Sequence, residues 1–110
     1  MKIGIDAIAM DTPDFYVDLV KLAQVRGDDP DKYTIGIGQD EQAVPPSSQD
    51  IVTMGANAAT KLLTPAIRAS LGMVLVGTES GVDASKSAAL FIHDLLALPC
   101  LLYTSDAADE

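Results

Sequence analysis

The sequence predicts an α/β fold, and a strand followed directly by a turn and a helix carries that prediction. Residues 73–76 are an apolar run rich in branched side chains, which is typical of a strand buried on both faces of a sheet. Gly81 then allows a sharp turn, and Ser85 or Ser87 can cap a helix that begins near Lys86. The whole chain has 110 residues, enough for one domain with a modest core.

Composition excludes several classes of protein. Hydrophobic residues make up 48% of the chain and charged residues 21%, which is ordinary for a globular domain. The net charge of −9 argues against a nucleic-acid binder and against an anionic membrane surface as partner. No apolar run approaches the ~20 residues of a membrane span, and Asp6 interrupts what would have to be the apolar core of a secretory signal. The lone Cys100 excludes an internal disulfide and a cysteine-based metal cluster, so we expect no metal site and a cytoplasmic location.

The amino-terminal half begins with an expected strand over residues 2–9, whose apolar members are Ile3, Ile5 and Ile8. Asp6 inside it is expected to bond neighbouring backbone. Residues 11–14 have turn chemistry, and residues 28–31 form a polar loop or short turn. Between them we expect a helix that Asp18 caps and Gly27 ends, with an apolar face of Leu19, Leu22 and Ala23.

Two features of the middle of the chain call for a choice between interpretations. Gly36 and Gly38 are spaced as in a dinucleotide fingerprint, but the third glycine and the framing strand and helix are missing, so we reject that motif. A tight loop is the simpler interpretation, although glycine-rich backbone near Lys32 can also approach a ligand closely. Residues 44–48 contain two prolines and are expected to form a rigid connector, not a domain boundary.

The second half is expected to hold three helices. Asp50 can cap a helix over residues 51–63, and Thr64 with Pro65 can end it and start a short one. The stripe of the long helix is Ile51, Met54, Gly55, Ala58, Ala59 and Leu62, whose small members suit close approach to a sheet or helix. The last helix covers residues 86–98, with an apolar face of Ala88, Phe91, Ile92, Leu95 and Leu96. We expect its His93 to be an ordinary helix residue.

Glu79 is the first candidate for chemistry. It follows the predicted strand at its carboxyl end, where open α/β sheets place their ligands. Partial burial at that edge would favour the uncharged form of the carboxyl group and suit it to proton transfer. The alternative is a loop carboxylate that points into water or caps the next helix.

Five blocks in order resemble the amino-terminal part of the hydroxymethylglutaryl-CoA synthase family, its bacterial branch above all. They are Gly-Ile-Asp-Ala-Ile (4–8), Tyr-Val-Asp-Leu (16–19), Lys-Tyr-Thr-Ile-Gly-Ile-Gly-Gln (32–39), Gln-Asp-Ile-Val-Thr-Met-Gly-Ala-Asn-Ala-Ala (49–59) and Gly-Thr-Glu-Ser-Gly-Val-Asp-Ala-Ser-Lys-Ser (77–87). The resemblance implies a thiolase-like α/β/α/β/α layered sandwich and a homodimer. It also implies the condensation of acetyl-CoA with acetoacetyl-CoA on the way to mevalonate and isoprenoids, with both thioesters as substrates and no cofactor.

The resemblance also implies site residues. Glu79 matches the family's catalytic glutamate, whereas the family's cysteine, in a Glu-Ala-Cys-Tyr-like motif, and its histidine have no match here. Cys100 stands in a Leu-Pro-Cys-Leu-Leu context and is not that nucleophile. Asp29, Pro30 and Lys32 match the family's segment that holds the nucleotide end of CoA.

The tail departs from the family pattern. We interpret residues 1–99 as the amino-terminal part of a thiolase-like domain and residues 100–110, which resemble translated adapter sequence, as a non-native tail. The chain by itself is then expected to be inactive and to expose apolar surface. Two rival hypotheses are a condensing enzyme like ketoacyl synthase III, against which Glu79 speaks, and a non-catalytic acyl-CoA-binding module, which would fold and bind alone.

Overall fold

A computed structural model describes residues 3–99 and 102–106. The chain forms two compact units: a small unit, Thr12–Ser48, and a larger unit made of Met1–Asp11 and Gln49–Glu110. One division falls at Ser48, at the end of the proline-containing connector. The division into two compact units coincides with this connector, because the segment before it pairs its own two strands and packs its own helices.

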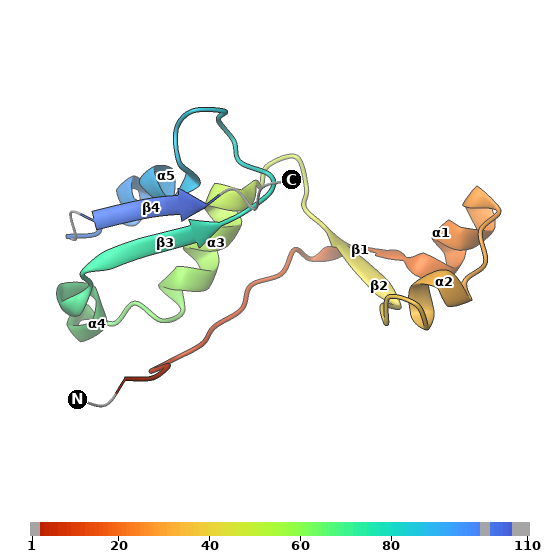
Figure 1. The fold of residues 1–110 in the computed structure, drawn as a ribbon, viewed down its shortest axis with the longest axis horizontal. Coiled ribbons are helices and arrows are strands. Elements are labelled where there is room, and N and C mark those ends of the chain that lie inside the picture. Colours follow the sequence, from red (N-terminus) through yellow and green to blue (C-terminus); the bar gives the residue numbers. More distant parts are fainter. Residues whose placement is uncertain (1–2, 100–101, 107–110) are drawn as a thin grey trace. The chain divides into compact units, whose positions relative to one another are not determined.

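The small unit consists of one pair of strands and two helices (Figure 1). Strand β1 (Phe15–Asp18) pairs antiparallel with β2 (Glu41–Val44), Phe15 lying opposite Val44. Helix α1 (Leu19–Arg26) follows β1 directly, and the single turn α2 (Asp31–Thr34) follows the loop after it. Neither strand was predicted, because both are short and largely exposed and so carry no apolar alternation.

Both ends of α1 form as predicted. The Asp18 carboxylate accepts a hydrogen bond from the Lys21 amide at 3.0 Å, which caps the helix. Gly27 adopts the left-handed conformation, with φ of 70°, that ends the helix. The amide of Asp28 then donates to the carbonyl of Ala23 at 2.9 Å, so the chain leaves α1 in a fixed direction.

The larger unit holds three helices and two strands among its described residues. These are α3 (Ile51–Thr60), α4 (Pro65–Ser70), β3 (Met73–Gly77), α5 (Ala88–Leu95) and β4 (Leu102–Asp106). Strands β3 and β4 pair in parallel, and α5 packs against α3 and both strands (Figure 1). The buried core residues of this unit are Val52, Ala56, Ala88, Ala89, Ile92 and Leu98.

Local capping chemistry sets the helix starts of this unit as predicted. Asp50 accepts from the Thr53 amide at 2.8 Å, while the Thr53 hydroxyl accepts from the Asp50 amide at 2.9 Å. The Thr64 hydroxyl caps α4 with Pro65 at its first position, and the Ser87 hydroxyl caps α5. The ends are less well predicted, because α3 stops at Thr60 and α5 at Leu95, three residues before the expected limits in each case.

Close approach of α3 to another helix is confirmed at Gly55. A Cβ atom built there would lie 2.7 Å from Cδ1 of Ile92 in α5. The most buried residues of α3 are nevertheless Val52 and Ala56, which the predicted stripe omitted. Half of the stripe is Gly and Ala, which carry little apolar area, so it defines the buried side of the helix poorly.

The predicted strand over residues 2–9 does not form within the described residues. Ile3, Ile5 and Ile8 are about four-fifths exposed, and none of the described strands pairs with this segment. A strand needs a partner for its backbone groups, which explains the error.

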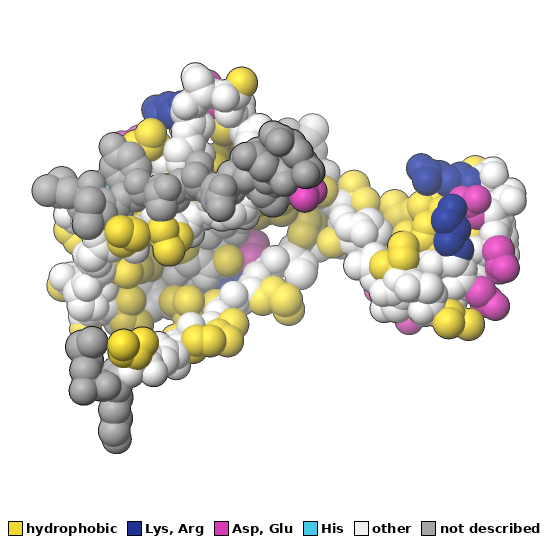
Figure 2. Space-filling model, viewed as in Figure 1, with side chains coloured by type: hydrophobic (Ala, Val, Ile, Leu, Met, Phe, Trp, Pro, Cys, Tyr) yellow, Lys and Arg dark blue, Asp and Glu magenta, His cyan; other side chains and the backbone are white. Residues whose placement is uncertain are grey.

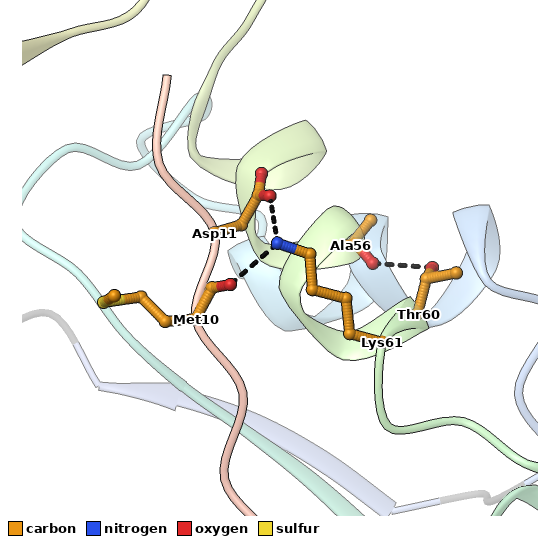
Figure 3. A network of polar contacts seen from close by, with 5 residues as sticks. All are labelled: Met10, Asp11, Ala56, Thr60 and Lys61. Carbon is orange, nitrogen blue, oxygen red and sulfur yellow. Dashed lines mark hydrogen bonds and ion pairs between the residues drawn. The ribbon is translucent and has the colours of Figure 1, made fainter. Parts of the chain in front are cut away.

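The segment is instead held at its end by α3, as Figure 3 shows. The Lys61 ammonium donates to the carbonyl of Met10 at 2.8 Å and to the Asp11 carboxylate at 2.6 Å. The hydrogen bond from Lys61 lowers the pKa of Asp11. The ion pair thus joins the start of the chain to the end of α3, some 50 residues further along.

Strand β3 forms as predicted, but its expected burial on both faces was wrong. Met73 is 50% exposed and Leu75 69% exposed, whereas Val74 and Val76 are half-buried. This alternation shows that one face of β3 is covered and the other is not. The exposed face confirms the expectation that the chain by itself displays apolar surface along residues 73–76.

We predict that the exposed face of β3 drives self-association of the chain. Leu75→Thr places a β-branched residue, which suits a strand, at this position. It should reduce aggregation, measured by light scattering and dye binding, with stability within about 0.5 kcal/mol of the parent. The matched control Val76→Thr, on the covered face, should destabilise by about 1–2 kcal/mol in thermal or urea unfolding. Equal loss of stability in both variants would contradict the one-sided burial.

Candidate active site

Glu79 lies where the sequence placed it, directly after β3. Residues 78–87 form the loop that leads from β3 into α5. A hollow of about 420 Å³ opens along this loop. Its lining includes Thr78, Glu79, Val82, Asp83, Lys86 and Ala88. The carboxyl end of β3 therefore borders a concave surface.

The expected partial burial of Glu79 is not present in this chain. Its side chain is exposed, as is nearly all of the loop from Glu79 to Lys86. No described element covers the open side of the loop, so water reaches the carboxylate. The hollow provides a place for a reacting group but not the desolvation that the sequence analysis expected.

Asp83 holds the shape of this loop, a role that the sequence analysis missed. Its Oδ1 accepts from the amides of Ser85 and Lys86, both at 2.8 Å, and from the Ser85 hydroxyl at 3.1 Å. These hydrogen bonds, the one from the Ser85 amide above all, lower the pKa of Asp83. The signal was present in the sequence, since an aspartate two residues before a serine is typical of a side-chain-closed turn.

Lys86 brings a positive charge to the same hollow. Its ammonium lies 4.3 Å from the centre of the Phe91 ring, a cation–π distance. The sequence predicted Lys86 only as the start of a helix. The structure makes it part of the wall that also contains Glu79.

The second predicted set, Asp29, Pro30 and Lys32, comes together at the start of α2 in the small unit. Pro30 is the cap residue of α2, and the Asp29 carboxylate accepts from the Asp31 amide at 3.0 Å. The Lys32 side chain is 62% exposed, and its ammonium lies 3.6 Å from Oδ1 of Asp28. An accessible cation thus stands beside the Asp-Pro turn, as phosphate binding requires.

Asp28 and Tyr33 complete this cluster, and neither was predicted. The Tyr33 hydroxyl donates to Oδ2 of Asp28 at 2.8 Å, and the Lys32 ammonium lies 5.6 Å from the Tyr33 ring centre. The Tyr33 hydrogen bond, followed by the charge of Lys32, lowers the pKa of Asp28. Figure 2 shows Lys and Arg side chains gathered over this unit, with acidic side chains beside them.

The remaining sequence predictions concern metals, membranes and two single residues. Among residues 3–99 and 102–106, no group of three or more His, Cys, Asp and Glu side chains could hold a metal ion. In that same part of the chain, every helix is too short or too polar to cross a bilayer. His93 lies in α5, as expected, and Cys100 lies outside the described residues.

Comparison with known proteins decides the family. A family model described as the amino-terminal part of hydroxymethylglutaryl-coenzyme A synthase matches residues 1–98. The chain belongs to the hydroxymethylglutaryl-CoA synthase family. Hydroxymethylglutaryl-CoA synthase of Enterococcus faecalis is 51% identical over 98 residues, which make up 89% of this chain and 26% of that protein. The Haloferax volcanii enzyme is 45% identical over 101 residues, covering 86% of this chain and 22% of its own length.

Solved structures show the fold. A hydroxymethylglutaryl-CoA synthase complexed with CoA superposes with a TM-score of 0.86 at 33% identity, covering 97% of this chain and 28% of that one. MvaS in complex with 3-hydroxy-3-methylglutaryl coenzyme A gives a TM-score of 0.82 at 40% identity, with 97% and 27% covered. The predicted α/β, thiolase-like fold is thereby confirmed. The chain spans about a quarter of the length of these relatives.

We predict that the Asp83 carboxylate holds the turn to Ser85 and Lys86 within the loop of residues 78–87. Since the folded state lowers its pKa, this stabilisation is present above the ordinary carboxyl value of about 3.9 and is lost as pH falls through the lower, folded value. Asp83→Ala should speed amide hydrogen exchange of Ser85 and Lys86 at neutral pH, while Asp94→Ala, in α5, should leave both amides unchanged. Unchanged exchange in Asp83→Ala would show that the carboxylate does not hold the turn.

Proposed function

We propose that this chain forms the amino-terminal part of an enzyme that condenses acetyl-CoA with acetoacetyl-CoA to give hydroxymethylglutaryl-CoA. The match of the family model over residues 1–98 carries this proposal. The name of the Enterococcus faecalis relative and the ligand of the MvaS structure support it. We further propose a cytoplasmic homodimer in the mevalonate route to isoprenoids, and no cofactor beyond the two thioester substrates.

Glu79 is the proposed general base. The methyl group of an acetyl thioester is acidified by the adjacent carbonyl, and a carboxylate within reach accepts its proton. The carbon nucleophile so formed attacks the ketone carbon of acetoacetyl-CoA, which forms the new carbon–carbon bond, and the resulting alkoxide takes up a proton. Hydrolysis of the thioester that carried the acetyl group then leaves a carboxylate, so the product retains a single CoA. The hollow beside β3 supports this role, since it leaves room for a substrate next to Glu79.

The Glu79 side chain is exposed to water in this chain, which affects its strength as a base. A carboxylate in open water is a weak base for a carbon acid, and excluding water raises its effectiveness. We therefore propose that further chain or a partner subunit covers the hollow in the working enzyme. The chain described here would then be inactive alone, as the sequence analysis expected.

Asp29, Pro30 and Lys32 are the proposed contacts for the nucleotide end of CoA. The cluster supports this role because it presents an exposed ammonium next to a rigid Asp-Pro turn. A local cation can hold a phosphate even though the chain has a net charge of −9. The relative solved with CoA shows that the family includes CoA binders.

The test of the base is Glu79→Gln in the complete enzyme. The amide keeps the shape of the side chain but cannot accept the proton, so condensation should fall by about 10²–10⁴-fold. Acetylation of the family's cysteine by acetyl-CoA, measured separately by mass spectrometry, should be unchanged. Asp83→Asn, which alters a second carboxylate of the same hollow, serves as the control and should cost less. A Gln variant that condenses at the parental rate would refute the assignment.

The test of the CoA contact is Lys32→Ala in the same enzyme. Loss of the ammonium should weaken acyl-CoA binding, and the loss should be larger at low salt than at high salt because a local ionic contact is screened. Calorimetric titration measures both values. Lys21→Ala, which removes an exposed cation of α1 instead, is the matched control. Equal affinity of Lys32→Ala and the parent at both salt levels would contradict the placement.

A further inference from the structure

Lys32, the proposed phosphate contact, already has an anionic partner within the chain. The ammonium of Lys32 is already paired with the Asp28 carboxylate at 3.6 Å. A phosphate group bound to the same ammonium would stand next to that carboxylate. Because two anions beside one cation repel each other, the phosphate and Asp28 cannot both use Lys32 at full strength.

Asp28 is itself held firmly. Its amide is bonded to the carbonyl of Ala23, and its Oδ2 accepts from the Tyr33 hydroxyl at 2.8 Å. The positive charge of Arg26, in the last turn of α1, also acts on the carboxylate and contributes to its lowered pKa. Asp28 therefore keeps two favourable partners if Lys32 turns away.

Lys32 is the more exposed member of the pair. Its side chain is 62% exposed, and its contact with Asp28 is longer than a direct hydrogen bond. Such an exposed ion pair contributes little to stability, so a stronger anion exchanges for it at small cost. A phosphate monoester carries up to two negative charges and three acceptor oxygens, more than one carboxylate offers.

We propose that Asp28 is an internal competitor for the Lys32 ammonium, which a phosphate group of the ligand displaces on binding. This inference rests on the proposed role of Lys32 in CoA binding. Asp28 then sets a threshold: a phosphorylated ligand takes the ammonium, while a singly charged anion does not. Asp28 keeps its hydrogen bond from Tyr33 and the nearby positive charge of Arg26 when Lys32 turns away.

The experiment is a double-mutant cycle in the complete enzyme, with CoA as the probe and calorimetry as the readout. Asp28→Asn keeps an acceptor for Tyr33 but removes the competing charge, and it should tighten CoA binding by about threefold to fivefold at low salt. The gain should shrink at high salt. In a Lys32→Ala background the same substitution should give no gain in CoA affinity, because Asp28 then has no Lys32 ammonium to compete for.

Two further variants make the result decisive. Asp31→Asn removes an equal charge from the same turn, and Asp31 takes part in none of the ion pairs found among the described residues, so its gain should be clearly smaller. Asp28→Ala removes the same charge without adding an amide, so it controls for an effect of the asparagine side chain itself. Thermal unfolding shows that each variant is folded. Unchanged or weaker CoA binding in both Asp28 variants, or an equal gain without Lys32, overturns the inference alone. Parental enzyme that binds no CoA overturns the proposed function and this inference with it.

Discussion

The contact between α3 and α5 at Gly55 and Ile92 is the constraint on which the larger unit depends. A side chain at position 55 would have to displace the end of Ile92, so the absence of one lets the two helices approach closely. The position of α5 against β3 in turn fixes both ends of the loop of residues 78–87. The place of Glu79 therefore depends in part on a close helix–helix contact between Gly55 and Ile92.

Features that depend on a few neighbouring residues were predictable from the sequence. Asp18, Asp50 and Ser87 cap their helices because a short polar side chain reaches amides two or three residues further on, whatever the rest of the chain does. Gly27 ends α1 for an equally local reason. The turn closed by Asp83 is also a local feature, so it was predictable from the sequence although it was not predicted.

Features that depend on distant chain were not predictable in this way. The apolar pattern of residues 2–9 is that of a strand, but no described strand pairs with it. Residues 73–76 have the composition of a strand buried on two faces, and only one is covered. Composition reports what a segment requires in the complete fold, whereas the structure reports what this chain supplies. Strands β1 and β2 show the converse, since pairing across more than twenty residues stabilises segments that carry no pattern of their own.

In the candidate sites, too, some residues were identified from the sequence and others only from the structure. The position after the predicted strand identified Glu79, and the family resemblance identified Asp29, Pro30 and Lys32. The roles of all four remain proposals, and their interacting neighbours became visible only in the structure. Asp28 and Tyr33 lie next to Lys32 because only four residues separate the end of α1 from the start of α2, which brings both side chains to one turn. Each compact unit carries one of the two residue sets. The proposed reaction needs both sets on one pair of substrates, so neither unit is a condensing site by itself.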